Sequence, residues 1–382
     1  MRCFADPRSR TRFWDGLSIP TTIAQSLRYI PKVRGYAARC AALSGSLLAH
    51  VSTADDARDL DYLRRLVGDR RLTYHAVSYG TFLGQTYANM FRGRVRAMAL
   101  DGLVDPRIVT RGAEARFGDT VAGLDPGLRA FESQCQKAGA TRCALAGHGS
   151  VAARVGRLLA RLRRGPIPAP TARPPGALSY GDALVVLFAS LSNPRSWPQL
   201  GQHLDEAARG DGSALATLAR AALAGVRSAA GDPPEAIICA DSPARRRLRA
   251  WPEVIGRLTR VSRVGGPFVA WTGWAPCASW RARSVDTYRG PWNAMTRRPI
   301  LVIGTRFDTG TPYPNARRVA RLLGNAVLLT HDGYGHTSEA DPSACVMKAT
   351  ARYLVHRVTP SRGTVCPSDR QPFDPDFGEP VP

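Results

Sequence analysis

The sequence predicts an α/β fold, in which a parallel sheet is flanked by helices and a helix-rich region is inserted between its two halves. Helix-like and strand-like patterns alternate over residues 53–100 and again over residues 299–356, and this alternation is typical of parallel sheets. The long segment between them has helical periodicity and clustered prolines but no periodic strands. We therefore expect a first part of the sheet domain at 1–107, a helical insertion at 108–290 and the rest of the sheet domain at 291–382.

The first alternating stretch begins with a helix. Thr53, with Asp56 three residues later, resembles a capping box. Apolar residues then recur at helical spacing until Gly68, which supplies a stop. The elements expected after this helix are a strand at Leu72–Val77, a helix at Thr81–Phe91 and a strand at Ala97–Leu100.

The inserted region is expected to be mostly helical. Helical spacing of apolar side chains is clearest at Tyr180–Leu191, Gln199–Arg209 and Leu215–Val226. Residues 1–50, at the other end of the chain, also lack a clean strand pattern. The strands of the sheet should therefore come from the two alternating stretches.

The second alternating stretch is predicted to complete the sheet. One strand leads into a loop with Asp308, and the next leads into a glycine-rich turn with His336. The tail at 366–382, rich in proline and aspartate, is expected to lie on the surface or to be disordered. The elements are a strand at Ile300–Ile303, a helix at Asn315–Leu323, a strand at Ala326–Leu329, a turn at 332–336 and a helix at Ser343–His356.

The junction between the first strand and its helix carries the strongest chemical signal. Ser78 lies within Ala76-Val77-Ser78-Tyr79-Gly80, and a serine between a strand and a helix matches a nucleophile elbow. Such a turn lifts the hydroxyl above the sheet edge, and the free N–H groups of the helix face a developing oxyanion. The usual first residue of this motif is glycine, and Ala76 adds one methyl group there. A purely structural turn is the alternative.

A serine nucleophile needs a base, and the base needs an acid to hold it. Ser78, Asp308 and His336 follow three predicted strands in the order serine, acid, histidine. Loops after parallel strands meet at one edge of a sheet, so these residues can converge. Asp332 is a rival acid, but it lies only four residues before His336, which makes its approach to Nδ1 awkward. His75, on the strand before Ser78, is expected to pack beneath the elbow.

The composition limits the classes of partner. A net charge of +23 is typical of proteins that bind nucleic acid or an acidic surface. We expect no nucleic-acid partner, because arginines are spread along the whole chain and the only lysines are Lys32, Lys137 and Lys348. Zinc-finger spacing, RNP-like aromatic strands and basic heptads are also missing from the sequence. The 382 residues, 44% of them hydrophobic, suffice for a sizeable core.

The eight cysteines form an even set without a C-x-x-C pair. They argue against zinc or thioredoxin-like chemistry and permit disulfides in an oxidising compartment. Met1–Gly16 is polar and has no apolar signal-peptide core, and no run approaches the roughly 18 apolar residues of a membrane span. Cysteines typical of export without an export signal suggest a chain that begins late. If its start is real, a cytoplasmic location is expected.

Motifs along nearly the whole chain carry a family resemblance. They are Thr53–Asp61, Ser78–Thr81 with Leu83-Gly84, Asp101–Pro106, Ala236–Asp241, Gly304–Asp308, Gly333–His336 and Gly363–Cys366. With this set, the chain resembles the tripeptidyl-aminopeptidase-like α/β-hydrolases of actinobacteria, the serine peptidase group that also contains prolyl aminopeptidases.

The resemblance implies an α/β-hydrolase sheet with a helical cap at 108–290, and an aminopeptidase that releases short peptides or residues from peptide N-termini. It makes Ser78 the nucleophile, His336 the general base and Asp308 the orienting acid. It also makes the N–H of Tyr79 an oxyanion donor. A secreted or cell-envelope location follows, no metal or cofactor is implied, and the oligomeric state stays open. The family pairing of cysteines is Cys3–Cys40, Cys135–Cys143, Cys239–Cys277 and Cys345–Cys366.

The chain also departs from the family pattern. In the family an H-G-G-P-G loop supplies one oxyanion donor, and several strands precede the elbow. Neither occurs in these 382 residues, so we expect the first strands, the signal sequence and half of the oxyanion hole to be lacking. Loss of one such donor typically costs about 10²- to 10³-fold in turnover. Two alternatives therefore stay open: an esterase on small acyl esters, which uses the same triad, and a catalytically impaired remnant without turnover.

An aminopeptidase needs a carboxylate to hold the ammonium group of its substrate. Glu206, Glu235 and Asp241 are candidates in the cap, and the sequence does not choose among them. A cluster of tryptophans near Cys277 is expected to be core rather than a peptide pocket. Its members are Trp271, Trp274 and Trp280.

Overall fold

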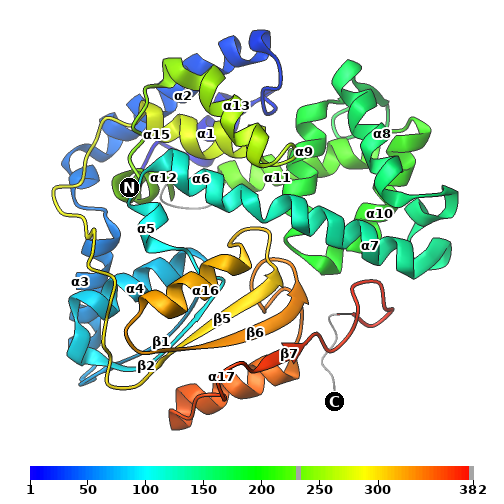
Figure 1. Ribbon diagram of the computed structural model, residues 1–382. Coiled ribbons are helices and arrows are strands. Elements are labelled where there is room, and N and C mark those ends of the chain that lie inside the picture. Colours follow the sequence, from blue (N-terminus) through cyan, green and yellow to red (C-terminus); the bar gives the residue numbers. More distant parts are fainter. Residues whose placement is uncertain (229–233, 378–382) are drawn as a thin grey trace.

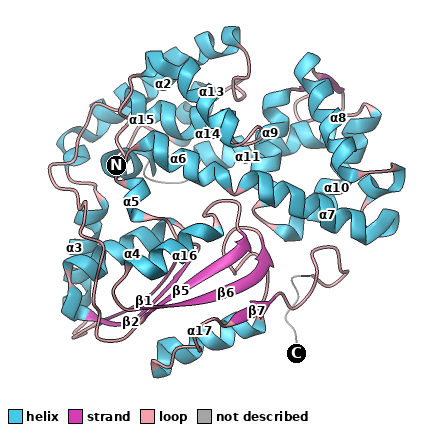
Figure 2. Cartoon of the chain, in the orientation of Figure 1, coloured by secondary structure: helices cyan, strands magenta, loops and turns pink. Residues whose placement is uncertain are grey.

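A parallel sheet of five strands forms the lower half of the molecule in Figure 1. The computed structural model describes residues 1–228 and 234–377. Figure 2 shows the strands as one twisted layer below a mass of helices. The strand order is β1-β2-β5-β6-β7, and each neighbouring pair is parallel. The strands are β1 (Leu72–Val77), β2 (Val95–Asp101), β5 (Ile300–Phe307), β6 (Ala326–Tyr334) and β7 (Val365–Pro367). The predicted α/β class is confirmed.

Helices cover both faces of the sheet, and each face has its own apolar core. Alternate side chains of a strand point to opposite faces, so Met98 packs with one helical layer while Ala99 packs with the other. Strands buried on both sides read as continuous apolar runs, as the sequence does here. The helices on the first face are α3 (Thr53–Leu66), α4 (Tyr79–Met90) and α16 (Tyr313–Leu322), and α17 (Ala344–His356) lies on the second.

The cap of α3 lies one residue earlier than predicted. Ser52 is the N-cap, and its hydroxyl accepts a hydrogen bond from the N–H of Asp55, whose carboxylate accepts one from the N–H of Ser52. The predicted pair of Thr53 and Asp56 was wrong because Thr53 is already helical. At the other end, Gly68 follows the helix with φ +78°, in agreement with the predicted stop.

The strands that carry the predicted loops are longer than their apolar runs. β5 continues four residues past Ile303, and β6 continues through Asp332 to Tyr334, where a turn was predicted. Pairing with a neighbouring strand holds these polar residues in the sheet, since Asp332 pairs with Pro367 and Phe307 pairs with Tyr334. Hydrogen bonds between strands therefore determine where β5 and β6 end, and a sequence pattern does not show them.

His75 does not pack beneath the elbow. It is exposed, because β1 is an edge strand of the described sheet and His75 points to the face where α17 packs mainly on β2. Tyr74, its neighbour, points to the opposite face and packs in the core there.

The segment 108–290 is helical, as predicted, and also contains a small hairpin that the sequence analysis missed. The hairpin pairs β3 (Ile167–Ala169) with β4 (Gly176–Leu178). The α-helices described between residues 106 and 290 are α5 (Pro106–Val109), α6 (Ala113–Ala122), α7 (Leu124–Arg142), α8 (Val151–Arg164), α9 (Tyr180–Leu191), α10 (Trp197–Arg209), α11 (Ser213–Ser228), α12 (Pro234–Asp241), α13 (Trp251–Val261), α14 (Gly266–Val269) and α15 (Ala275–Ser279). They lie above the carboxyl ends of the strands in Figure 1.

Two N-terminal helices join this helical layer rather than the sheet. They are α1 (Pro7–Trp14) and α2 (Ile23–Ser44). The ring of Tyr29 lies 5.4 Å from that of Trp271, and both belong to the large core of the helical layer. Trp271 and Trp274 are almost fully buried there, as expected of core residues. The division of the chain at 107 and 290 stays a proposal. In the structure, α1 and α2 from the N-terminal part also belong to the helical layer.

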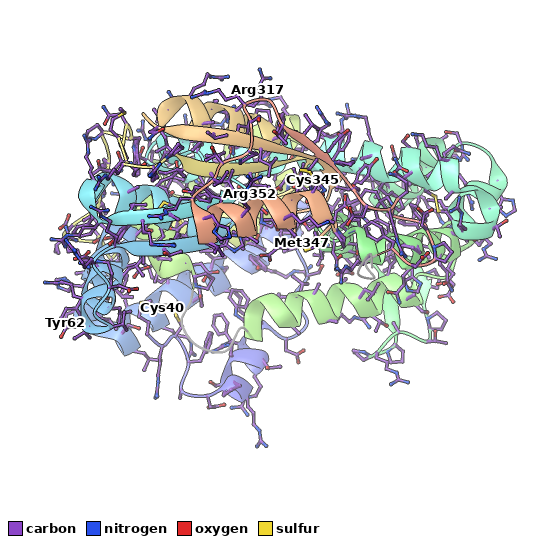
Figure 3. The ribbon with its side chains drawn as sticks, turned by 90° about the horizontal axis from the view of Figure 1, so that it is seen from below. Cys40, Tyr62, Arg317, Cys345, Met347 and Arg352 are labelled. Atoms are coloured by element: carbon purple, nitrogen blue, oxygen red, sulfur yellow. A yellow bond between two sulfur atoms is a disulfide. The ribbon has the colours of Figure 1, made fainter. Side chains whose placement is uncertain are left out.

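Four disulfides connect the eight cysteines in the predicted pairing. Cys345, labelled at the start of α17 in Figure 3, is bonded to Cys366 in β7 and so fixes the last strand to the helix below the sheet. Of the predicted tail, residues 366–377 include part of β7, whereas 378–382 lie outside the described residues. None of the described helices has the length and apolar character needed to cross a membrane.

Candidate active site

Ser78 occupies a strained turn between β1 and α4. Its φ is +53° and its ψ is −125°, a conformation that non-glycine residues rarely adopt. Such strain persists only when the surroundings impose it, and here the N–H of Ser78 donates to the carbonyl of Asp101 at 2.9 Å. A Cβ on Gly80 would lie 2.9 Å from the Cβ of Ala76. The close approach of strand and helix therefore explains why both positions are small.

Asp308 and His336 reach the same edge of the sheet from adjacent strands. Asp308 follows the end of β5, and His336 follows β6 by two residues. Between β6 and His336, Gly335 turns the chain with φ +81°. Because β5 and β6 are parallel neighbours, the two loops emerge side by side above the elbow.

The structure brings the three predicted side chains into one hydrogen-bonded row. The Nε2 atom of His336 lies 2.7 Å from Oγ of Ser78, and its Nδ1 atom lies 2.9 Å from Oδ1 of Asp308. The rival Asp332 is exposed and pairs with Arg306 instead. The row therefore has the spacing that a nucleophile, a base and an orienting acid require.

The carboxylate of Asp308 is held in place by donors from two loops. Its side chain is buried and accepts hydrogen bonds from the N–H of Gly310 at 2.8 Å and that of Thr311 at 2.7 Å. The hydroxyl of Thr311 at 2.9 Å and the N–H of Thr337 at 3.1 Å complete the set. These four hydrogen bonds fix the orientation of the carboxylate toward Nδ1 of His336. Thr311 was not among the predicted site residues, although an aspartate two residues before a glycine is typical of a turn in which the side chain bonds to its own backbone.

The environment of His336 sets its proton affinity. Burial lowers the pKa of its ring, but the charge of Asp308, the hydrogen bond to Asp308 and the charge of Asp101 raise it, and the net direction is upward from the ordinary value of 6.5. A protonated ring is thus stabilised by two carboxylates. Such a ring is suited to take a proton from Ser78 and to hold it briefly.

Tyr79 follows the serine and opens α4, whose first N–H groups have no acceptor within the helix. Its hydroxyl donates to Oδ2 of Asp241 at 2.8 Å and lies 2.9 Å from Oγ1 of Thr53. The guanidinium of Arg116 lies 4.8 Å from the ring centroid. Burial, followed by the charge of Asp241, raises the pKa of the Tyr79 phenol. The phenol therefore stays neutral and donates to Asp241, which anchors the first turn of α4.

A cavity of ≈ 290 Å³ opens onto Ser78, Tyr79 and His336. Apolar side chains from the sheet domain and the helical layer form much of its wall. Two carboxylates and one guanidinium also line it, from Asp105, Asp119 and Arg116. This volume is at the lower end of the range for ligand pockets, about 300–1,000 Å³.

The three carboxylates considered for an ammonium group do not line this cavity. Glu235 accepts a hydrogen bond from the hydroxyl of Tyr36 at 2.8 Å. Glu206 pairs with His203 on the outer helix α10. Asp241 is committed to Tyr79 and Thr53.

Asp119 is the better placed carboxylate. It lines the cavity with a side chain that is 19% exposed, and it accepts hydrogen bonds from Asn315 at 2.6 Å and Arg318 at 3.2 Å. Burial raises the pKa of Asp119, whereas these two partners lower it, and the net direction is upward. Asp105, the other carboxylate, is almost fully buried and bonded to Arg318 at 2.9 Å. Asp119 therefore presents the more accessible negative charge.

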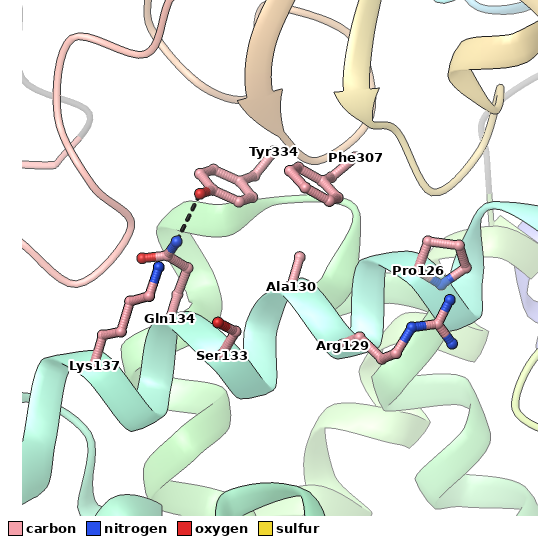
Figure 4. Close-up of a pocket in the computed structure, with 8 residues that line it drawn as sticks. All are labelled: Pro126, Arg129, Ala130, Ser133, Gln134, Lys137, Phe307 and Tyr334. Atoms are coloured by element: carbon pink, nitrogen blue, oxygen red, sulfur yellow. Dashed lines mark hydrogen bonds between the residues drawn. The ribbon is translucent and has the colours of Figure 1, made fainter.

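A second hollow, of ≈ 340 Å³, lies between α7 and the ends of β5 and β6 and contains none of the three residues of the row. Figure 4 shows the rings of Phe307 and Tyr334 side by side at its roof. Their centroids are 5.2 Å apart and their planes are inclined by 9°. Gln134 on α7 donates to the hydroxyl of Tyr334 at 2.6 Å. These contacts tie the helical layer to the two strands whose loops carry Asp308 and His336.

In the described ranges, no three or more His, Cys, Asp or Glu side chains gather in a way that would hold a metal ion.

Comparisons with known proteins agree with this architecture. Residues 19–121 match the family model of the alpha/beta hydrolase fold, and residues 262–366 match that of TAP-like proteins. The chain is 33% identical over 355 residues to serine protease Hip1 of Mycobacterium tuberculosis, which covers 88% of this chain and 65% of that protein. It is 28% identical over 377 residues to tripeptidyl aminopeptidase of Streptomyces lividans, which covers 94% of this chain and 66% of that protein.

A third relative has a different printed activity. Carboxylesterase B of Mycobacterium tuberculosis is 33% identical over 336 residues, which cover 84% of this chain and 61% of that protein. The chain thus spans somewhat less than two thirds of the length of these curated relatives.

Proposed function

Because this chain belongs to the α/β-hydrolase fold family and includes a TAP-like segment, we propose that it is a serine hydrolase that releases short peptides or single residues from the N-termini of peptides. The observation that carries the proposal is the row in which His336 lies 2.7 Å from Ser78 and 2.9 Å from Asp308. Relatives named as a serine protease and a tripeptidyl aminopeptidase support the same reaction class.

In the proposed mechanism Oγ of Ser78 attacks the substrate carbonyl while Nε2 of His336 takes the hydroxyl proton. Asp308 holds the ring with Nδ1 protonated and stabilises the imidazolium. The N–H of Tyr79 donates to the oxyanion of the tetrahedral intermediate. When the C–N bond breaks, His336 returns the proton to the leaving amine, and an acyl group remains on Ser78. Water, deprotonated by His336, then releases the acyl group and restores the serine.

A carboxylate on the cavity wall supplies the preference for N-termini in this proposal. A free N-terminus carries a positive charge, and Asp119 is the accessible carboxylate on the cavity wall. The limited volume of ≈ 290 Å³ suits a short N-terminal segment rather than a long chain. The arrangement favours an exopeptidase over an endopeptidase.

Asp119→Asn is expected to lower kcat/KM for peptides with a free N-terminus by about 10- to 100-fold, the usual value of a hydrogen bond to a charged group. Hydrolysis of the same peptides with an acetylated N-terminus should change little, because they carry no ammonium group. The measurement is the ratio of the two kcat/KM values in each variant. Glu206→Gln, which removes a carboxylate outside the cavity, is the control and should keep the wild-type ratio. An unchanged ratio in Asp119→Asn would exclude Asp119 as the ammonium site.

An esterase is the second candidate, because one relative is named carboxylesterase B. The same row of residues serves ester hydrolysis without any ammonium site. An esterase should cleave p-nitrophenyl esters of short acyl chains far better than aminoacyl p-nitroanilides, and its rates should not respond to Asp119→Asn. Preference for the anilides with a free amino group would favour the aminopeptidase.

We also propose that the chain acts in an oxidising compartment, at the cell envelope or outside the cell. The support is the pairing of all eight cysteines, since such sets persist where thiols are oxidised. Thiol titration of protein isolated from its native host under denaturing conditions tests this: we expect no free thiol. A full set of eight free thiols would contradict it.

A further inference from the structure

The motif Asp101-Gly102 contacts the loop that carries the proposed base, although neither residue belongs to the hydrogen-bonded row. Asp101 is the last residue of β2 and pairs with Val77 of β1, the residue before the nucleophile. Its carbonyl accepts the N–H of Ser78 at 2.9 Å. The backbone of Asp101 therefore fixes the position of the nucleophile, Ser78.

The side chain of the same residue holds the loop that carries the base. Oδ2 of Asp101 accepts the N–H of Ser338 at 3.0 Å and its hydroxyl at 2.6 Å. Ser338 lies two residues after His336, on the loop that carries the ring. The carboxylate is almost fully buried, so these bonds are shielded from solvent.

The loop that Asp101 holds is strained. Thr337, between His336 and Ser338, has φ +67° and is buried. A non-glycine residue stays in this region only where its neighbours impose it. Asp308 accepts the N–H of Thr337 at 3.1 Å and Asp101 accepts that of Ser338, so two carboxylates secure consecutive peptide groups.

Gly102 allows the loop to come this close. It has φ +66°, and a Cβ at this position would lie 2.7 Å from Cγ2 of Thr337 and 2.9 Å from Oγ1 of Thr311. Its N–H donates to the carbonyl of Ile303 in β5 at 3.1 Å. The motif is therefore fixed to the strand that leads to Asp308 as well as to the elbow.

We propose that Asp101 is a positioning residue that holds Ser78 through its backbone and the His336 loop through its carboxylate, and so sets the distance between nucleophile and base. This inference rests on the proposed function of the row. A displacement of about 1 Å at a reacting centre can cost about 10²-fold in rate, so the clamp should affect kcat far more than KM.

The charge of Asp101 also acts on the base. Burial raises the pKa of Asp101 to about 7, while its bonds to Ser338 lower it and the carboxylates of Asp308 and Glu339 raise it. His336, Asp308 and Glu339 are the charged or titratable groups that face it. Where Asp101 is ionised it raises the pKa of His336. Removal of that charge should lower the pKa of His336.

Three variants separate the bond from the charge. Asp101→Ala removes both bonds to Ser338 and should slow labelling of Ser78 by a fluorophosphonate probe by about 10²-fold. Asp101→Asn keeps an acceptor oxygen, so it should label within several-fold of wild type. Ser338→Ala loses only the hydroxyl bond and should fall between the two. Asp332→Asn, an exposed carboxylate on the preceding strand, is the control and should label like wild type.

A measurement that needs no turnover completes the test. The His336 ring is titrated by NMR in histidine-labelled protein and assigned from the spectrum of His336→Gln. Asp101→Asn should shift the pKa of His336 downward, whereas loss of mere packing would leave it in place.

The outcomes are distinct. Two results together would overturn the positioning role. The first is labelling at the wild-type rate by folded Asp101→Ala, or by Ser338→Ala if Asp101→Ala does not fold. The second is an unchanged pKa of His336 in Asp101→Asn. A wild-type protein that does not label would count against the proposed function instead, and the titration would then decide the role of Asp101.

Discussion

Alanine in place of Ser78 is expected to abolish labelling by a fluorophosphonate probe and to reduce kcat by about 10⁶-fold on any substrate that the wild type hydrolyses, as for other serine nucleophiles held by a histidine. The probe reacts with a hydroxyl that a neighbouring base activates, and Oγ of Ser78 lies 2.7 Å from Nε2 of His336. Labelling is measured by intact-protein mass spectrometry, and peptide mapping should place the adduct on Ser78.

The substitution is a fair test because it leaves the backbone requirement unchanged. Serine and alanine both carry a Cβ, so both are strained at the φ of +53° found at the elbow. Ser133→Ala, which removes an exposed serine beside the second hollow, is the matched control and should label fully. An adduct on folded Ser78→Ala would assign the nucleophile elsewhere. Folded wild type without labelling or turnover would favour the impaired remnant.

The elements around the elbow could be predicted because their signals are local. β1 has the predicted bounds, Leu72–Val77, since an apolar run between an arginine pair and a turn leaves little choice. α9 likewise has its predicted bounds, Tyr180–Leu191, with Ser179 and Asp182 forming a capping box at its start. The order of Ser78, Asp308 and His336 along the chain was enough to anticipate their meeting, because parallel strands bring their ends to one edge.

The partners of these residues could not be predicted in the same way. Asp101 meets Ser338 across 237 positions of sequence, and Asp119 lines the cavity because α6 crosses above the sheet. Of the carboxylates considered in advance, Glu235 accepts a hydrogen bond from Tyr36 of α2, a helix for which no bounds were predicted. Contacts of this kind depend on how layers pack, and single-sequence periodicity says only that a layer exists.

Asparagine in place of Asp308 is expected to lower kcat by about 10⁴-fold, the size found when a triad acid is replaced by its amide. The amide keeps the shape of the carboxylate but loses its charge, and its NH₂ group can donate to Nδ1. The ring of His336 would then carry its proton on Nε2, which must instead accept the proton of Ser78. The Ser78–His336 contact would persist without a usable base.

The pH dependence gives this prediction a sign. His336 acts as a base only when neutral, and its pKa is raised above 6.5 by Asp308 and Asp101 despite burial. In wild type, kcat/KM should therefore fall as the pH drops through a value above 6.5. The residual kcat/KM of Asp308→Asn should fall, along this acidic limb, at a lower pH than that of wild type, because the charge that raised the pKa of His336 is gone. Asp332→Asn removes a carboxylate that pairs with Arg306 instead, so both kcat and the limb should stay at wild-type values. If the limb of Asp308→Asn coincides with that of wild type, Asp308 does not act on His336.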